Sequence, residues 1–308
     1  MLGFVTSLPH PVNCASYDRR CELLGDTLRS ILDQTDPDLC VVIVANEPPV
    51  GGHLPHDPRV EIVLVDFPPP HKPEGTPVIT DAMYADKGGK LSVGTAAARR
   101  RGADYIMWVD SDDFVTNRLA AFVAASAGAN GWFSDSGFFH VQGSRTVTPV
   151  EHDFHQRNGS THVLRADLTG VPETIEPTMT RTEVIDAVGQ KRVRSIMGDH
   201  KWIVAFYEDL GTPLAPLPFP AAIWEIGTGE NFSRILTAAG SSRPVAGAIA
   251  AEYGLPVPSR LDAVRSQVAG VRARIERRLS TRKESLEDLR ARIQEPDGET
   301  PASEPSHD

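Results

Sequence analysis

The sequence predicts an α/β fold, and three observations lead to this prediction. First, helical and strand patterns follow one another in the order strand, helix, strand, strand, helix, strand over roughly residues 1–115. Second, the strand segments include unbroken apolar runs, which are typical of parallel strands covered on both faces. Third, the apolar run at 105–109 ends in Asp110, Asp112 and Asp113. Because ligands bind at the carboxyl ends of the strands in such sheets, we expect a Rossmann-like nucleotide-binding half with its site there.

The elements of this half follow from periodicity and from the residues that flank each segment. A short apolar strand at 3–8 ends at a proline-containing loop, and Leu24, Leu28 and Ile31 recur at helical spacing within a predicted helix at 21–34. The runs at 40–45 and 60–66 predict two further strands. A helix at 91–101 then leads into the strand that ends at Asp110.

The remaining chain divides into three further segments. Residues 116–235 mix short strand-like pieces with helical patterns at 118–127 and 181–188, which suits the acceptor-binding, catalytic half of the same domain. Residues 236–295 form a helical extension, in which 259–295 reads as one long amphipathic helix or two in tandem, with ten Lys/Arg and six Asp/Glu. We expect this helix to pack on the domain or to form a homodimer, with attachment to an acidic membrane as the alternative. Residues 296–308 are an acidic tail that we expect to be disordered.

Composition excludes several classes of protein. The formal net charge of −10 argues against affinity for nucleic acid. The three cysteines have no zinc-binding spacing and are expected to be reduced thiols. No stretch approaches the ~18–20 apolar residues of a membrane span. We therefore expect a cytoplasmic protein, with peripheral membrane contact through the C-terminal helix as the alternative.

The three clustered carboxylates indicate a cation. Carboxylates this close repel one another unless a positive charge neutralises them, and a divalent metal that takes its other ligands from phosphates would do so. The alternative is a cap on the following helix, since Asp112 and Asp113 shortly precede the predicted helix at 118–127.

Several motifs, in order along the chain, resemble glycosyltransferases of the GT-A fold, most similar to the family 2 type. They are the first strand, the segment Ser30-Ile-Leu-Asp-Gln-Thr35, the strand at 41–44, Lys87-Gly-Gly-Lys90 before a helix, and Asp110-Ser-Asp112-Asp113. The resemblance covers residues 3–235, and the segment around Ser30 also suits a rhamnosyltransferase-like branch of the family.

The resemblance implies roles for the residues that match the family's motifs. Asp110, with Ser111, would contact the nucleotide ribose, and Asp112, with Asp110, would bind Mn²⁺ or Mg²⁺ on the diphosphate. Asp113 would bind a metal-held water or fix the loop. Asp199 would be the catalytic base, with His200 orienting it or binding phosphate, although the family usually has Glu-Asp where this chain has Gly-Asp-His. The alternative for Asp199 is a helix cap, and the reserve candidates for the base are Asp135 and Asp153.

Further candidates for substrate contacts carry weaker signals. Those for the nucleotide base, ribose and phosphates are Thr6, Ser7, Pro9, Asn46, Glu47, Asp66, Lys87 and Lys90. Stacking on an acceptor sugar is expected of Trp132, Trp202 or Trp224, with burial in the core as the alternative for each.

Together these observations predict a metal-dependent glycosyltransferase. It would move a sugar from a nucleotide-sugar donor of the UDP, dTDP or GDP type to a hydroxyl of a glycan, lipid-linked or small-molecule acceptor. The resemblance implies an inverting reaction. Two alternatives are a sugar-phosphate nucleotidyltransferase, which lacks support because no glycine-rich loop follows the first strand, and an inactive scaffold that acts through its C-terminal helix.

Overall fold

The computed structural model describes residues 1–71, 80–230, 240–245, 247–259 and 261. The chain divides into two compact units, Met1–Val257 and Pro258–Asp308, and nearly all described residues belong to the first. The long helix expected at 259–295 and the tail at 296–308 lie outside the described residues, apart from residues 259 and 261.

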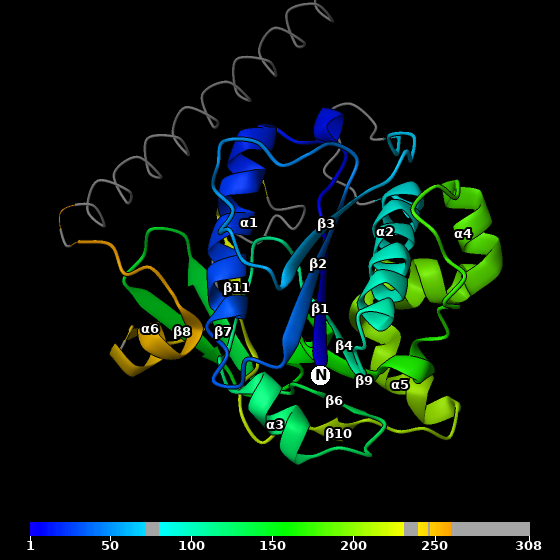
Figure 1. Ribbon diagram of the computed structural model, residues 1–308. Coiled ribbons are helices and arrows are strands. Elements are labelled where there is room, and N and C mark those ends of the chain that lie inside the picture. The colour runs from blue at the N-terminus through cyan, green and yellow to red at the C-terminus, as the bar shows by residue number, and fades with distance from the viewer. Residues whose placement is uncertain (72–79, 231–239, 246, 260, 262–308) are drawn as a thin grey trace, which may run out of the picture. The chain divides into compact units, whose positions relative to one another are not determined.

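The first unit contains a seven-stranded sheet whose centre is parallel (Figure 1). Its order is β10 (Ala215–Pro216), β6 (Gly131–Phe133), β9 (His162–Arg165), β4 (Tyr105–Trp108), β1 (Leu2–Ser7), β2 (Leu39–Ala45) and β3 (Val60–Leu64). Strands β4, β1, β2 and β3 run parallel to one another, whereas β9 is antiparallel to both β4 and β6. The predicted α/β class is therefore confirmed.

A second sheet of five strands lies beside the first. Its order is β12 (Arg243–Pro244), β8 (Thr146–Val150), β7 (Gly137–Val141), β11 (Ala222–Ile226) and β5 (Phe114–Val115). Strand β7 pairs with β11, more than 80 residues away in sequence. Within residues 116–235, β6, β9 and β10 extend the main sheet, whereas β7, β8 and β11 belong to this second sheet.

Helices cover both faces of the main sheet (Figure 1). One core contains residues of α1 (Tyr17–Leu32) and α3 (Leu119–Ala125); the other contains residues of α2 (Asp81–Arg100), α4 (Arg181–Val188) and α5 (Ile203–Asp209). Successive side chains along β2 point alternately into the two cores. Val41 and Ile43 join the core that contains α1, whereas Val42 and Val44 join the core that contains α2. All seven residues of β2 are buried, as its unbroken apolar run predicted.

Helix α2 begins ten residues before the predicted start of that helix. The Thr80 side chain caps it by accepting a hydrogen bond from the Met83 N–H at 3.3 Å. The pair Gly88-Gly89 disfavours a helix by propensity, but a Cβ at Gly88 would collide with the carbonyl of Val193. That residue belongs to η4 (Arg192–Gly198), a π-helix that packs against α2. Close packing between two helices thus explains both the glycine and the error in the predicted boundary.

Helix α6 (Gly247–Tyr253) belongs to the first unit. Tyr253 and Leu255 pack in a small core with Phe114, Phe138 and Ile223 of the second sheet. The Tyr253 hydroxyl also donates to the Pro220 carbonyl at 2.7 Å. The boundary between the two compact units falls after Val257, and the functional division expected at residue 235 stays a prediction.

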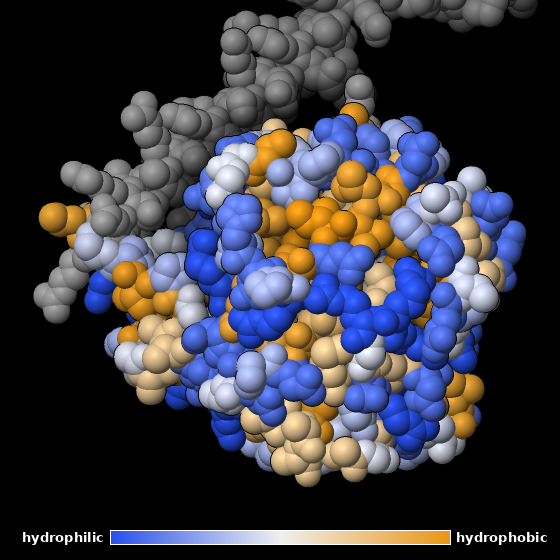
Figure 2. Space-filling view, in the orientation of Figure 1, coloured by the Kyte–Doolittle hydropathy of each residue, from blue (hydrophilic) through white to orange (hydrophobic). Residues whose placement is uncertain are grey.

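Strand β3 is an edge of the main sheet and exposes apolar side chains. Ile62 and Leu64 are each 45% exposed, and Figure 2 shows hydrophobic side chains gathered over the region of β3, bordered by hydrophilic ones. Among the described residues no helix is long and apolar enough to cross a membrane.

Candidate active site

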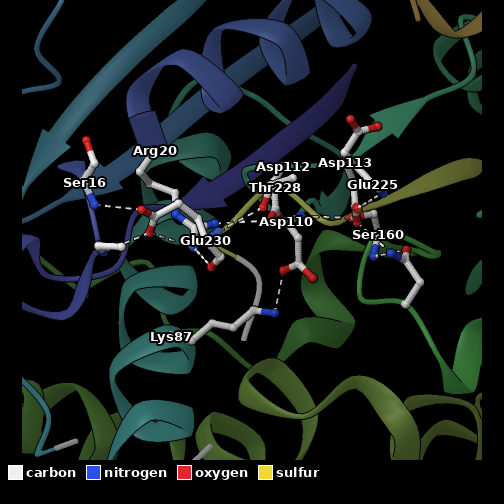
Figure 3. Close-up of polar contacts among 12 residues, drawn as sticks. Ser16, Arg20, Lys87, Asp110, Asp112, Asp113, Ser160, Glu225, Thr228 and Glu230 are labelled. Carbon is white, nitrogen blue, oxygen red and sulfur yellow. Dashed lines mark hydrogen bonds and ion pairs between the residues drawn. The ribbon is translucent and has the colours of Figure 1, made fainter. Parts of the chain in front are cut away.

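The acidic loop, Asp110-Ser111-Asp112-Asp113, follows β4 and lies at the carboxyl edge of the main sheet. Strand β4 pairs in parallel with β1, and the Val109 N–H continues the ladder by donating to the Val5 carbonyl at 2.9 Å. The chain then turns sharply, since the Asp113 N–H donates to the Asp110 carbonyl at 3.2 Å. This turn directs Asp110, Asp112 and Asp113 toward three different sets of partners (Figure 3).

Asp110 pairs with Lys87 of α2. The Lys87 Nζ lies 2.5 Å from Asp110 Oδ1, and each side chain is 31% exposed. Burial would raise the pKa of Asp110, but the ammonium of Lys87 outweighs this and holds it below the ordinary value. Burial likewise disfavours the charged form of Lys87, yet Asp110 keeps the lysine pKa above its usual value. Both groups are therefore charged at neutral pH and open to a ligand.

Asp112 pairs with Arg20 of α1. Arg20 is 3% exposed, and its Nη1 donates to Asp112 Oδ2 at 3.2 Å. Its Nη2 donates to the backbone carbonyl of Glu230 and lies 3.8 Å from Glu230 Oε2. The Glu230 carboxylate accepts hydrogen bonds from the Ala15 and Ser16 N–H groups at 3.2 and 2.7 Å. Arg20 thus joins the acidic loop, the start of α1 and the segment after β11.

Asp113 is buried and fully engaged in hydrogen bonds. It is 1% exposed, and its Oδ2 accepts from Asn158 Nδ2 at 2.7 Å and from the Ser160 hydroxyl at 2.6 Å. Its Oδ1 accepts from the Glu225 N–H at 3.3 Å. Burial and the neighbouring carboxylates raise the pKa of Asp113 well above its usual value. This geometry corresponds to the loop-fixing alternative for Asp113.

Packing of α2 against η4 brings Asp199 and His200 toward the acidic loop. A Cβ at Gly198 would lie 2.5 Å from the Tyr84 carbonyl oxygen, so glycine permits the close approach. The Asp199 carboxylate accepts a 3.4 Å hydrogen bond from the Lys201 N–H at the start of η5 (His200–Trp202). Burial, assisted by the charge of Lys87, lowers the pKa of His200 to about 4, so this imidazole is neutral at pH 7.

The reserve candidates for the base belong to a histidine-rich neighbourhood at the same edge. Asp135 follows β6 and lies within 3.4 Å of His152 and His155. It also accepts a hydrogen bond at 3.0 Å from the N–H of Asp153, an exposed residue with φ of 58°. The Asp135 carboxylate is therefore tied to imidazoles, whereas the Asp199 carboxylate accepts one long hydrogen bond among the described contacts.

Lys90 has no free path to a phosphate. Its side chain is 1% exposed, and its Nζ donates to the Leu8 carbonyl at 2.9 Å and to Asp86 Oδ2 at 2.7 Å. Asp86 also accepts from Arg181 of α4 at 3.1 Å. Lys90 therefore holds the end of β1 against α2, and Lys87 is the more accessible of the two lysines predicted to contact phosphate.

The other nucleotide-site candidates lie at the end of β1 or in the loops that follow β1, β2, β3 and β4. Ser7 and Pro9 are partly exposed, whereas Thr6 within β1 is fully buried. Asn46 donates to the Val65 and Phe67 carbonyls at 3.2 and 2.8 Å, so its amide fixes the chain after β3. Glu47, Asp66 and Ser111 complete this set; the first two are exposed and the last is 5% exposed. Their contacts with a nucleotide stay predictions.

The three tryptophans proposed for stacking have different environments. Trp132 is 4% exposed and packs against Tyr105 and Phe122, so it is a core residue. Trp224 is partly buried, with its ring 4.9 Å from that of Phe139. Trp202 is 61% exposed and follows His200 by two residues. Trp202 is therefore the one of the three that is available to a sugar in this structure.

The acidic loop is chemically suited to a divalent cation. Burial raises the pKa of Asp112 above its usual value even though the guanidinium of Arg20 opposes this, and the charge of Asp110 adds to the effect. Negative charge is thus in excess, and a cation at Asp112 would relieve it. No group of three His, Cys, Asp or Glu side chains in the described part of the chain is arranged around a metal position. A cation would therefore take its remaining ligands from phosphate and water, as Mg²⁺ commonly does.

Sequence analysis missed the partners of the carboxylates. Nothing in the sequence distinguishes Arg20 from a solvent-exposed arginine of a helix, and its neighbour Arg19 is partly exposed. Asn158, Ser160 and Glu230 come from loops, whose positions no periodicity reports. The cluster itself was the available signal, because three carboxylates so close together, one of them buried, require compensating partners.

Comparisons with known proteins give only weak likenesses. No protein-family model matches the sequence, and no curated protein matches it. Among solved structures, TarS residues 1–349 from S. aureus are 11% identical, with a TM-score of 0.40 over 73% of this chain and 60% of that one. The same protein in complex with UDP-GlcNAc is 13% identical, with a TM-score of 0.41 over 76% of this chain and 60% of that one. The galactosyltransferase LgtC in complex with donor and acceptor sugar analogs is 12% identical, with a TM-score of 0.38 over 77% of this chain and 92% of that one. This chain thus spans less than two thirds of the TarS structure, and TM-scores this low identify neither its fold family nor its activity.

Proposed function

We propose that this chain is a glycosyltransferase of the GT-A type, which transfers a sugar from a nucleotide-sugar donor to an acceptor hydroxyl. The observation that carries the proposal is the acidic loop at the end of β4, in contact with one cation from each face of the sheet. Lys87 reaches it from α2 and Arg20 from α1 (Figure 3). Carboxylates for a metal and a ribose, beside a partly exposed ammonium for a diphosphate, are the groups that this reaction requires.

Lys87 is the proposed contact to the donor diphosphate. In this structure its ammonium is bound to Asp110, and both side chains are partly exposed. A phosphate oxygen can compete for the ammonium, and the released Asp110 carboxylate can then accept hydrogen bonds from ribose hydroxyls. A charged group that binds the leaving diphosphate stabilises the charge that develops in the transition state.

Asp112, with Asp110, would hold Mn²⁺ or Mg²⁺. When bound, the ion would neutralise charge on the departing nucleoside diphosphate. The contribution of the chain is to keep Asp112 oriented, which the 3.2 Å hydrogen bond from Arg20 does. Asp113 is not part of the proposed ligand set, because Asn158, Ser160 and Glu225 occupy its oxygens.

Asp199 is the proposed general base. Its carboxylate is partly exposed at the start of η5, and Lys201 holds it through one backbone hydrogen bond. It would take the proton from the acceptor hydroxyl as that oxygen attacks the anomeric carbon. The neutral His200 beside it can accept or donate a hydrogen bond without adding charge, and the exposed Trp202 offers a face for a sugar ring.

A product assay tests the proposal. The purified chain is incubated with UDP-, GDP-, dTDP- and CMP-sugars, with Mn²⁺ and with Mg²⁺, and the released species are separated by ion exchange. Slow release of nucleoside diphosphate or monophosphate with free sugar from one donor is the expected result. Release of pyrophosphate from a nucleotide and a sugar phosphate would instead indicate the nucleotidyltransferase, and an inactive scaffold would release neither.

Asp199→Asn then tests the base. It should leave donor binding intact and lower transfer by at least ~10²-fold, the lower range for loss of a general base. Turnover close to that of the wild type would exclude Asp199, and Asp135→Asn and Asp153→Asn would be measured next.

A further inference from the structure

The turn Asn158-Gly159-Ser160 lies against the acidic loop from a distant part of the sequence. It precedes β9, the antiparallel neighbour of β4, and is nearly 50 residues from Asp110. Asn158 is 2% exposed and Ser160 is fully buried. A turn of small polar residues is normally found at the surface, so its burial beside three carboxylates requires an explanation.

The Ser160 hydroxyl binds two points of the acidic loop at once. It donates to Asp113 Oδ2 at 2.6 Å and accepts from the Asp110 N–H at 2.9 Å (Figure 3). Asn158 adds a bond from its Nδ2 to the same Asp113 oxygen at 2.7 Å, and its Oδ1 accepts from the Ser160 N–H at 2.9 Å. The turn thereby fixes both ends of the four-residue loop that carries Asp110 and Asp112.

Gly159 determines where the Asp110 carboxylate can lie. A Cβ at this position would lie 2.8 Å from Asp110 Oδ2 and 3.3 Å from its Cγ. The backbone φ of Gly159 is not in the left-handed region, so alanine would fit the chain itself. The absent side chain therefore leaves space for the carboxylate opposite Lys87, which bonds its other oxygen, Oδ1.

We propose that the 158–160 turn is the positioning element of the donor site. Ser160 sets the backbone of the acidic loop, and Gly159 sets the orientation of the Asp110 carboxylate. This inference rests on the proposed function for its effect on donor binding, but the geometric part concerns the free protein. None of the three residues is assigned a contact with substrate; each acts through Asp110 or Asp113.

A double-mutant cycle tests the geometric part without any ligand. Gly159→Ala, Asp110→Ala and the double variant are compared by thermal unfolding of the full chain. In the wild-type background the new methyl group meets the carboxylate, so Gly159→Ala should lower Tm by several degrees. In the Asp110→Ala background that loss should vanish, because the carboxylate is gone. An equal loss in both backgrounds would overturn the role of Gly159.

Ser160→Ala tests the effect on the site, with Ser134→Ala as the matched control. Ser134 is also fully buried, and its hydroxyl donates to the Ser136 carbonyl at 2.7 Å and accepts from the Ala221 N–H at 2.8 Å, so these two bonds do not involve the acidic loop. Both variants should lose similar thermal stability. Only Ser160→Ala should weaken donor binding, by about tenfold or more, since small displacements of reacting groups have large effects.

Equal donor affinity in the two serine variants would overturn the positioning role. Failure of the proposed function has a different signature, because the wild type itself would then bind no nucleotide sugar while the double-mutant cycle still reports on Gly159 and Asp110. Circular dichroism of each variant confirms that it is folded before binding is measured.

Discussion

Lys87 Nζ lies 2.5 Å from Asp110 Oδ1, and this ion pair joins α2 to the acidic loop at the carboxyl edge of the sheet. The pair comes from positions 23 residues apart, on two elements that pack through the α2 core. It places a cation where a diphosphate would need one and keeps Asp110 ionised.

Lys87→Met should weaken binding of a nucleotide-sugar donor by tenfold or more, because it removes a charge-assisted hydrogen bond to phosphate. Isothermal titration calorimetry with the donor that the product assay identifies measures this. Lys191→Met is the control, since Lys191 is exposed and lies over the Phe206 ring. Equal affinities of the two variants would mean that Lys87 serves Asp110 alone.

Arg20→Ala should destabilise the protein by about 3–5 kcal/mol, the range for removing one partner of a buried ion pair. The loss arises because Asp112 and Glu230 would each lose a guanidinium contact in a buried setting. Urea unfolding gives the free energy. Arg19→Ala is the matched control, because Arg19 pairs only with the partly exposed Glu22 among the described contacts, and its effect should stay below about 1 kcal/mol. Similar losses in both variants would contradict the structural role of Arg20.

Trp132→Ala and Trp202→Ala should separate core packing from a role in sugar binding. Trp132 lies in the core, so its removal should cost about 3–5 kcal/mol of unfolding free energy. Trp202 is 61% exposed, so its removal should leave stability nearly unchanged and raise the KM for the acceptor. Steady-state kinetics measures the acceptor KM of both variants. A wild-type acceptor KM in Trp202→Ala would contradict a role of Trp202 in sugar binding.

The buried pair His140–Glu225 should make stability depend on pH. His140 Nδ1 lies 2.6 Å from Glu225 Oε2, on neighbouring strands β7 and β11. Burial lowers the pKa of His140, but the hydrogen bond and charge of Glu225 outweigh it and raise the pKa above its ordinary value. Burial also raises the pKa of Glu225.

Both shifts favour the protonated forms in the folded state, so stability should fall as pH rises. For His140 the contribution is complete below the unfolded pKa of about 6.5 and is lost as pH passes the higher folded value. Urea unfolding at pH 6 and above compares the wild type with the double variant His140→Gln/Glu225→Gln. The loss of unfolding free energy with rising pH that comes from this pair should be absent in the double variant. An identical pH dependence in both proteins would contradict the assignment.

The part of the fold that follows local rules could be predicted from the sequence. Strands β1, β2 and β4 were expected from their apolar runs, and the bounds of α4 agree with the prediction at both ends. The second sheet was missed because its strands are short and β7 pairs with a strand far along the chain. The early start of α2 was missed because Gly88 is favoured by contact with η4, which propensity does not include.

The candidate site shows the same division. Asp110, Asp112 and Asp113 stand out in the sequence because they follow an apolar run, whereas Arg20 and the 158–160 turn are identified only by three-dimensional contacts. Of the two lysines in Lys87-Gly-Gly-Lys90, one pairs with Asp110 and the other is enclosed. They are three residues apart on a helix that is buried over most of its length, and no sequence pattern distinguishes the lysine that reaches the site from the enclosed one.

The central claim is most directly tested by a thermal-shift panel of UDP-, GDP-, dTDP- and CMP-sugars, each with and without Mn²⁺, on the wild type and on Asp112→Ala. Binding to the folded state alone should add about 2.7 kcal/mol at a hundredfold excess over Kd. The account predicts a rise in Tm with one nucleotide that requires Mn²⁺, and its loss in Asp112→Ala. No rise with any pair would contradict the glycosyltransferase assignment, and a rise that persists in Asp112→Ala would contradict the metal site.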